Sequence, residues 1–492
     1  MSSSSTSPLL FNGPRGFAKA RSEKANLMVE NRPYIPTLMF DPKDYEASVM
    51  NAAKVILSCA ERRGELNNDS EVTNIINNTA AMSTTGKVTI ICGGLTNALF
   101  RVDILANGNQ QQQQPITSVL VRIFGAEGMI DRDKETTNFA RLCDAKGIVH
   151  TQLDYVGRFG NGRVEKWIPN MRPATVGDLQ KNEHLAMEVT RQAARLHCSF
   201  DIPKYLLEDQ IFVVPHLASW NDELVTKISQ ACARDLRLAN IFCYALFGDT
   251  LQLFESSITD DDDHDDDDDG NKKAAVTEIM SHIAQQLNRE TRWMQNHIYE
   301  HHPNAPVAFC HNDINAANIL LNIRLDSSTN SDDYDKDSIA IIDYEYGAIN
   351  YTMYDLANFI CEHCGGNDNG IPDYGLLPSL EMQRRLVEQY IKERDRLQNI
   401  ASASNVEGDN EVSNLFSQVQ TFQMVSHFYW GTWGILQGAT ELLEEKYELE
   451  NVKSRLHGEK DIDRWCNLRY GQNRLSRYRE QKHSILRKRM NQ

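Results

Sequence analysis

The sequence predicts an α+β fold with a small part that contains an antiparallel sheet and a larger part that is mostly helical. Two observations place the sheet: residues 88–105 read as strand, glycine-containing turn and strand, and residues 118–125 read as a third strand. A helical pattern at 131–147 follows, closed by Gly147. The third observation is that helical periodicity dominates beyond Trp167. With 492 residues, 41% of them hydrophobic, the chain can bury a large core.

The chain divides into three regions. Residues 1–40 begin Ser-rich and are predicted to be a mobile N-terminal tail, 41–167 form the small lobe, and 168–492 form the helical lobe. Two short strands, at 319–322 and 339–343, interrupt the helical lobe and should pair as a hairpin. The helical spacing is found at 40–78, 183–200, 220–256, 274–300, 353–361, 379–398, 412–446 and from 461 to the end. A disordered acidic insertion is expected at about 257–273.

Charge and composition exclude several classes of protein. The net charge is −17, and nine aspartates in the run at 260–269 leave −8 for the remainder. A mildly acidic body argues against nucleic-acid binding and is compatible with a cationic substrate. No segment approaches about 20 consecutive apolar residues, and the start MSSSSTSPLL lacks a secretory pattern, so a cytoplasmic protein without stable membrane insertion is expected. Ten scattered cysteines indicate reduced thiols.

The strongest chemical signal is FCHNDINAANILLN at 309–322, followed by IAIIDYEYG at 339–347. Phosphoryl transfer requires an acceptor hydroxyl aimed in line and a metal that neutralises phosphate charge. Asp313 would orient the hydroxyl, and Asn318, five positions later, would present an amide oxygen to magnesium. Asp343 adds a carboxylate ligand, and Glu345 is placed for a second metal ion. An ordinary turn and a strand that ends in acids is the alternative, but both segments in this order favour catalysis.

These two segments and GGLTNALFRV at 93–102 resemble the choline/ethanolamine kinase family, a branch of the protein-kinase-like two-lobed fold. The similarity runs from about Val88 to beyond Trp433. The resemblance implies ATP and Mg²⁺ as cofactors and a small amino alcohol as substrate. It also implies that Asp355 and Asn358 brace the catalytic loop, and Asp355 is expected to have a structural role.

The resemblance also implies an ATP site in the small lobe. A glycine pair between strands is usually only a hairpin, so the assignment depends on the motifs that follow it. Arg122 stands where a protein kinase has its strand lysine, which argues against an ordinary protein kinase, and its expected partner is Glu135. An exposed salt bridge is the alternative for that pair. The candidate ATP-binding residues are Gly93, Gly94, Thr96, Asn97, Arg122 and Glu135.

The substrate site is predicted from a carboxylate and aromatic side chains. Trp430 and Trp433 are three apart and share a helix face. Such pairs are more often core residues, but the family places its amine-binding aromatics in the matching segment, with Glu362 facing the amine. Asn315 follows Asp313 by two residues, where choline kinases typically have glutamine and ethanolamine kinases leucine, and matches neither. The segments MIDRDKETTNFARL and DYGLLPSLEMQ resemble the ethanolamine branch.

Together these features predict an ATP-dependent ethanolamine kinase, which catalyses the family's first step of the CDP-ethanolamine route to phosphatidylethanolamine. A choline or dual-specificity kinase is the first alternative. An inactive nucleotide-binding regulator is remote, because Asp313, Asn318 and Asp343 are intact. An aminoglycoside phosphotransferase should lack the paired tryptophans. Small molecules are the expected partners, and a homodimer is left open.

Overall fold

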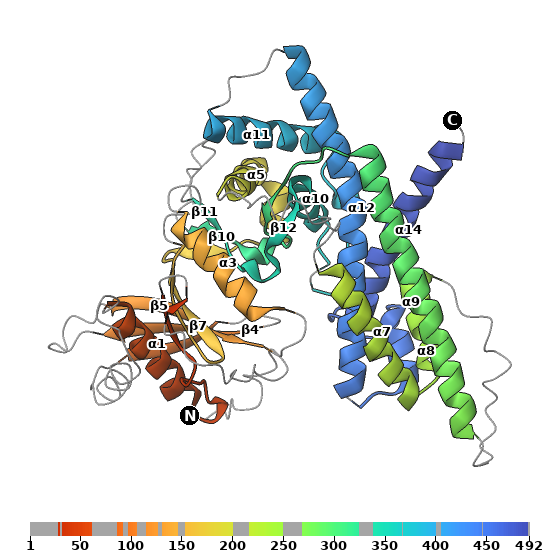
Figure 1. Cartoon of the computed structure of the whole chain (residues 1–492), viewed down its shortest axis with the longest axis horizontal. Coiled ribbons are helices and arrows are strands. Elements are labelled where there is room, and N and C mark those ends of the chain that lie inside the picture. Colours follow the sequence, from red (N-terminus) through yellow and green to blue (C-terminus); the bar gives the residue numbers. More distant parts are fainter. Residues whose placement is uncertain are drawn as a thin grey trace. The chain divides into compact units, whose positions relative to one another are not determined.

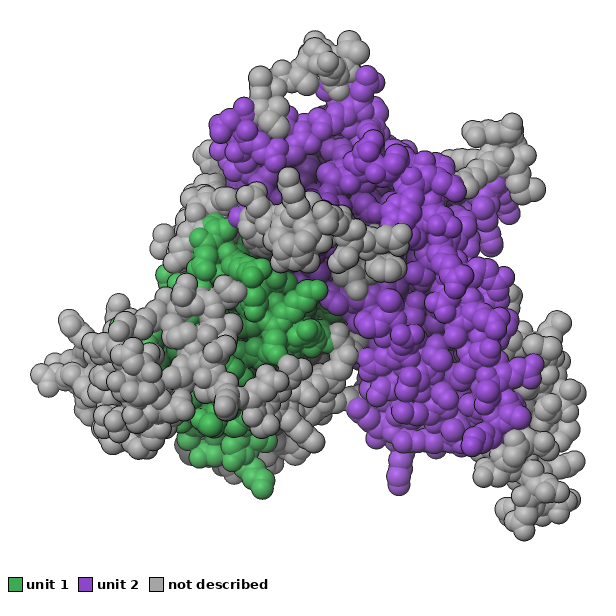
Figure 2. Space-filling model, in the orientation of Figure 1, with its two compact units in different colours: residues 1–173, 319–346 green, residues 174–318, 347–492 purple. Residues whose placement is uncertain are grey.

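The computed structural model describes residues 28–29, 32–61, 86–91, 97–105, 115–125, 130–145, 153–199, 216–248, 268–323, 338–366, 368–399, 405–444 and 446–490. The chain divides into two compact units, which are coloured in Figure 2. Unit 1 comprises Met1–Pro173 and Ile319–Tyr346, and unit 2 comprises Ala174–Asn318 and Gly347–Gln492. One boundary between the units lies between Asn318 and Ile319, and another lies between Tyr346 and Gly347. Each of the two predicted catalytic segments therefore contains a boundary.

Unit 1 contains a sheet of seven described strands (Figure 1). One of its neighbouring pairs, β2 with β6, is parallel, and the others are antiparallel. The strands β3 to β5 followed by helix α3 (Arg132–Asp144) confirm the predicted order of three strands and a helix. The sheet order is β1 (Met28–Val29), β2 (Arg32–Ile35), β6 (Tyr155–Phe159), β7 (Gly162–Lys166), β5 (Pro115–Phe124), β4 (Asn97–Leu105) and β3 (Gly86–Ile91).

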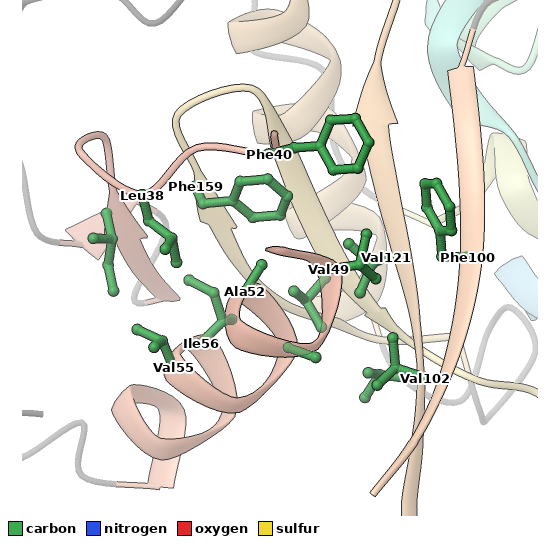
Figure 3. Packing of buried hydrophobic residues seen from close by; sticks show 14 of the residues in the cluster. Leu38, Phe40, Val49, Ala52, Val55, Ile56, Phe100, Val102, Val121 and Phe159 are labelled. Carbon is green, nitrogen blue, oxygen red and sulfur yellow. The ribbon is translucent and has the colours of Figure 1, made fainter. Parts of the chain in front are cut away.

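Helix α1 (Tyr45–Glu61) supplies much of the apolar core of unit 1. Its buried side chains, among them Val49 and Ile56, lie with Val121 and Phe100 of the sheet in the cluster drawn in Figure 3. These residues recur at helical spacing along α1, so one face of the helix covers the apolar side of the strands. The remainder of the predicted helical stretch, residues 62–78, lies outside the described residues.

Residues 32–40 differ from the expected mobile tail. Strand β2 pairs in parallel with β6, and the Leu38 and Phe40 side chains are 8% and 5% exposed. The segment RPYIPTLMF carries enough apolar side chains for burial to offset the loss of conformational freedom. Residues 1–27, also assigned to the tail, lie outside the described residues. The strands β6 and β7 were not predicted either.

A second, three-stranded sheet of unit 1 leads to the predicted metal-binding carboxylates. Strand β10 (Ile319–Asn322) pairs antiparallel with β11 (Ile339–Ile341), which confirms the predicted hairpin. On its other edge β10 pairs with β8 (Met171–Pro173), a strand that was not predicted. A short 3₁₀ helix, η5 (Tyr344–Tyr346), follows β11.

Unit 2 is mostly helical, as predicted. The expected helix at 220–256 is two helices, and the turn between them contains Asp235. Helix α9 begins at Asp268, inside the predicted acidic insertion, whose residues 257–267 lie outside the described residues. The helices are α4 (Val176–Lys181), α5 (Glu183–His197), α7 (Leu217–Arg234), α8 (Leu238–Phe247), α9 (Asp268–His301), α10 (Thr352–Glu362), α11 (Leu380–Gln398), α12 (Asn405–Glu444), α13 (Leu449–Leu456) and α14 (Asn467–Met490).

Helices α12 and α14 pack closely, which places their polar side chains in the interior of unit 2. A Cβ atom at Gly434 would lie 2.8 Å from the Cα of Gly471, so the two backbones approach at a point where only glycine fits. Two short strands, β9 (Val307–Cys310) and β12 (Ala348–Tyr351), pair antiparallel, and both contact α10. Among the described helices, none combines the length and apolar character needed to cross a bilayer.

Candidate active site

The predicted catalytic loop leaves strand β9 and ends in the 3₁₀ helix η3 (Ala316–Asn318) of unit 2. Asn312 has a φ of 67°, in the left-handed region that asparagine tolerates better than most residues. Its side-chain oxygen accepts a hydrogen bond of 2.8 Å from Asn350 Nδ2 on β12. The neighbouring strand therefore holds the loop in this conformation.

Asp313 and Asn318 are in direct contact. Asn318 Nδ2 donates to Asp313 Oδ2 at 2.9 Å and to the Asp313 carbonyl oxygen at 3.0 Å. Asn315 Nδ2 donates to the other carboxylate oxygen, Oδ1, at 3.0 Å. The two amides thus fix the carboxylate orientation, and because the Asn318 amide nitrogen is committed to these bonds, its oxygen is the atom suited to a metal ion.

Asp355, on α10, anchors the same loop through its backbone. Its carboxylate accepts hydrogen bonds of 2.7 Å from the backbone N–H groups of both His311 and Asn312, and it is fully buried. His197 Nε2 lies 3.0 Å from Asp355 Oδ2, and Tyr390 Oη lies 2.9 Å from His197 Nδ1. Charge-assisted bonds to backbone N–H groups are strong, so Asp355 is a structural brace of the loop.

The atoms of His197, Cys310 and Asp355 lie within 4.8 Å of one another, a spacing that a metal ion could bridge. However, the Asp355 oxygens already accept from two backbone N–H groups, and burial raises the pKa of the Cys310 thiol well above its ordinary value. A neutral thiol is a poor metal ligand. The cluster is therefore accounted for by its structural role.

In unit 1, Asp343 follows β11 and is held by Arg122 from β5. Arg122 Nη1 donates to Asp343 Oδ1 at 2.8 Å, and Asp343 has a φ of 66°. The Arg122 side chain is 2% exposed and the Asp343 side chain 23%. Burial alone would lower the pKa of Arg122, but the charges of Asp343 and Glu165 raise it above its usual value. Arg122 is therefore a permanent cation beside the predicted metal ligand.

The expected partner of Arg122, Glu135, is not its direct partner, and this prediction needs correction. Arg122 Nε donates to Glu165 Oε1 on β7 at 2.9 Å, whereas Glu135 is bound by Arg163 at 2.6 Å and by Arg132 at 2.8 Å. The reason is the strand register, which sets Arg122 directly opposite Arg163. The charges of two facing arginines must be compensated by acidic side chains. Glu165 bonds to both arginines, and Glu135 bonds to Arg163.

Glu345 is also engaged within unit 1. Its Oε2 accepts a hydrogen bond of 2.9 Å from Asn97 Nδ2 and one of 3.0 Å from Arg132 Nη1, and the residue is 7% exposed. Asn97, a predicted ATP-binding residue at the start of β4, is thus linked to the segment that carries Asp343. The predicted phosphate-binding residues Gly93, Gly94 and Thr96 lie outside the described residues.

The paired tryptophans lie on α12 in the interior of unit 2. Trp430 and Trp433 have ring centroids 5.8 Å apart in an edge-to-face arrangement and are 6% and 7% exposed. Trp430 Nε1 donates to Asn358 Oδ1 at 2.8 Å, and Asn358 Nδ2 donates to the carbonyl oxygen of Ile314 at 3.4 Å, next to Asp313. Asn358 therefore connects the aromatic pair to the predicted catalytic loop.

Glu362, at the end of α10, pairs with an arginine that was not predicted from the sequence. Arg474 Nη1, on α14, donates to Glu362 Oε1 at 3.1 Å, and both side chains are buried. Arg474 also lies 5.7 Å from the Tyr470 ring, whose centroid is 6.3 Å from that of Trp433. No short motif marks Arg474 or Tyr470, and only the unbroken helical pattern of the C-terminal segment could have indicated a buried face.

A sheet-containing unit and a mostly helical unit, with the aspartate and asparagine of the predicted catalytic loop in contact, are the features of a protein-kinase-like fold. An ethanolamine kinase structure from Plasmodium vivax has the same fold, with a TM-score of 0.52, 17% identity and coverage of 87% of this chain and 94% of that one.

The family follows from the sequence match. A model of the choline/ethanolamine kinase family matches residues 88–478, and the chain belongs to that family. Two relatives from Arabidopsis thaliana are each 26% identical to it. The probable ethanolamine kinase aligns over 73% of this chain and 74% of its own length, and probable choline kinase 3 over 72% and 80%.

Proposed function

We propose that this protein transfers the γ-phosphate of ATP to the hydroxyl group of ethanolamine, giving phosphoethanolamine and ADP. The observation that carries the proposal is the fixed carboxylate of Asp313, which Asn315 and Asn318 hold through both of its oxygens. A carboxylate oriented in this way can accept the proton of an incoming hydroxyl group. An inactive regulator would have no need for this arrangement.

Magnesium fits the oxygen donors on this chain. Mg²⁺ prefers carboxylate and amide oxygens together with phosphate oxygens and water. Each unit offers one such donor, the side-chain oxygen of Asn318 in unit 2 and the Asp343 carboxylate in unit 1, whereas Glu345 is already bonded to Asn97 and Arg132. When bound, the ion neutralises phosphate charge, while Arg122 supplies a permanent cation for a phosphate oxygen.

An amino alcohol is the substrate that the helical unit supports best. Glu362 offers a carboxylate and Trp430 and Trp433 offer aromatic faces, the two kinds of group that bind ammonium ions. A carboxylate can accept the N–H donors of a primary ammonium, whereas a quaternary ammonium has no such donors and relies on aromatic faces and on its charge. Choline remains the second candidate substrate, since the relatives include proteins named choline kinases as well as ethanolamine kinases.

The substrate is tested by ADP release from ATP in parallel reactions with ethanolamine, choline and an aminoglycoside. We expect kcat/KM to be highest with ethanolamine, lower with choline and undetectable with the aminoglycoside. A higher kcat/KM with choline would assign the protein to choline. ADP release that no acceptor stimulates would contradict the proposed function.

Asn315→Ala is expected to lower kcat only moderately. This change removes the hydrogen bond to Asp313 Oδ1, but the bonds from Asn318 remain. Loss of one hydrogen bond to a charged group costs about 1.5 kcal/mol, which corresponds to about a tenfold lower kcat. Steady-state kinetics with ethanolamine check the value, and an unchanged kcat would show that Asn315 does not orient the carboxylate.

A further inference from the structure

The function proposed above uses the Glu362 carboxylate but gives no role to its ion pair with Arg474. It joins α10 to α14, with 8% of the Glu362 side chain and 2% of the Arg474 side chain exposed. Arg474 contacts one carboxylate oxygen, Oε1, and the second oxygen has no hydrogen bond among the described residues. A carboxylate with one oxygen paired and one available can accept a second cation.

Arg474 is tied to the catalytic loop through α12. Its Nη2 donates to Ser426 Oγ at 3.0 Å, and Ser426 Oγ donates to Asn358 Oδ1 at 2.8 Å. The same Asn358 oxygen accepts a hydrogen bond from Trp430 Nε1, and Asn358 Nδ2 donates to the carbonyl oxygen of Ile314. A continuous chain of hydrogen bonds therefore runs from Glu362 to the residue beside Asp313.

The charge state of Glu362 depends on Arg474. Burial raises the pKa of Glu362 above its ordinary value, and the Arg474 charge acts against this effect. The other titratable groups that interact with Glu362 are Cys361 on α10, Cys364 in the turn that follows α10, and Tyr470 on α14. Burial raises the pKa of all three, to about 12 for the two thiols, so they are neutral at pH 7. His427, on α12, lies 3.7 Å from Cys361 Sγ, and burial lowers its pKa, so it is neutral as well.

We propose that Arg474 is a positioning residue that keeps Glu362 ionised and oriented, so that its second oxygen can bind the ammonium group of the substrate. This inference rests on the proposed function for the identity of that cation. Without Arg474, the buried carboxyl group would take up a proton at neutral pH. A neutral carboxyl group attracts an ammonium ion far less than a carboxylate does.

The test compares Arg474→Gln with the wild type through KM for ethanolamine from about pH 6 to about pH 9, where an alkyl amine stays largely protonated. We expect a flat profile for the wild type. In Arg474→Gln, KM should be at least about tenfold higher near pH 7 and should fall as pH rises, because Glu362 regains its charge. The kcat value should change by less than about threefold, and Arg474→Lys should restore most of the affinity.

The matched control is Arg477→Gln, one turn along α14, where Arg477 is 31% exposed and pairs with Glu480. It should leave the KM profile unchanged. A KM increase in Arg474→Gln that does not depend on pH, or a loss of kcat at unchanged KM, would overturn the proposal in favour of a packing role.

Thermal denaturation gives a readout that needs no turnover. When a buried acid has a pKa that is higher in the folded than in the unfolded protein, the free energy of unfolding falls as pH rises from the unfolded pKa to the folded pKa. In Arg474→Gln this loss should extend to pH values at least about one unit higher than in the wild type, and Glu362→Gln in the same chain should abolish it. If the loss does not extend, the inference fails even where ethanolamine is phosphorylated. If it extends but no amine is phosphorylated, the inferred ionisation holds and the proposed function fails.

Discussion

Asp313→Ala is expected to lower kcat for ethanolamine by about 10³-fold, within the range of about 10²–10⁴ that a positioned general base contributes. The change removes the carboxylate that Asn315 and Asn318 orient, and the acceptor hydroxyl then has no group to take its proton. The predicted ATP-binding residues are in unit 1, and Asp313 is in unit 2. ATP binding, measured by titration calorimetry, should therefore remain close to that of the wild type.

The control for this prediction is Glu381→Ala, an exposed acidic residue in the first turn of α11 in the same unit. It should keep wild-type kcat. Circular dichroism must show that Asp313→Ala has the same helical content as the wild type. Turnover within about threefold of the wild type, in a folded variant that binds ATP, would show that Asp313 is not the residue that orients the acceptor.

The local parts of the site were predictable because short spacings determine them. An aspartate and an asparagine five residues apart, on a loop that feeds a strand, have little freedom to be far from each other, and Asn318 does hydrogen bond to Asp313. The hairpin of β10 and β11 likewise follows from two apolar runs with a polar stretch between them. In both cases residues near in sequence decide the geometry.

The partner of Arg122 was not predictable because it depends on a strand that the sequence pattern did not reveal. Glu165 lies 43 residues from Arg122, on β7, and reaches it only through the register of β5 with β7. The segment GRVEK places Arg163 and Glu165 two apart, on one face of a strand. Two opposite charges on a face that should be buried were the available signal for an ion-pair network.

Long-range side-chain contacts between helices were also missed in unit 2. Arg474 is 112 residues from Glu362, and His197 is 158 residues from Asp355. Their contacts depend on which helix faces meet, and helical periodicity gives an apolar face without giving its partner. In a segment with many surface arginines and lysines, no local sequence feature distinguishes a buried arginine.

Glu135→Ala is expected to have the largest effect on stability, lowering the free energy of unfolding by about 3–5 kcal/mol, the usual cost of removing one partner from a buried ion pair. Glu135 is fully buried, and the change would leave Arg163 Nη1 and Arg132 Nη1 each short of one carboxylate contact. Glu165 and Glu345 would remain as their other partners. Chemical denaturation followed by circular dichroism measures the change.

Protonation of Glu135 is expected to make the protein less stable as pH falls. Burial alone would raise the pKa of Glu135, but Arg163, Arg132 and Arg122 outweigh that effect and lower it to about 2. Because the folded pKa lies below the unfolded value of 4.5, Glu135 stabilises the fold above about pH 4.5, and this contribution disappears as pH falls toward 2. In Glu135→Ala the corresponding part of the acid-induced loss of stability should be absent.

Asp133→Ala on the same helix is the matched control. Asp133 also pairs with an arginine, Arg158, at 2.6 Å, but its side chain is 48% exposed. Although Arg158 itself is buried, water screens the half-exposed Asp133 carboxylate, so we expect Asp133→Ala to lower the free energy of unfolding by only about 1 kcal/mol. If Glu135→Ala lowers the free energy of unfolding as little as Asp133→Ala does, the buried arginines tolerate the missing carboxylate. The network of Arg122, Arg163 and Glu165 would then hold Asp343 in place without Glu135.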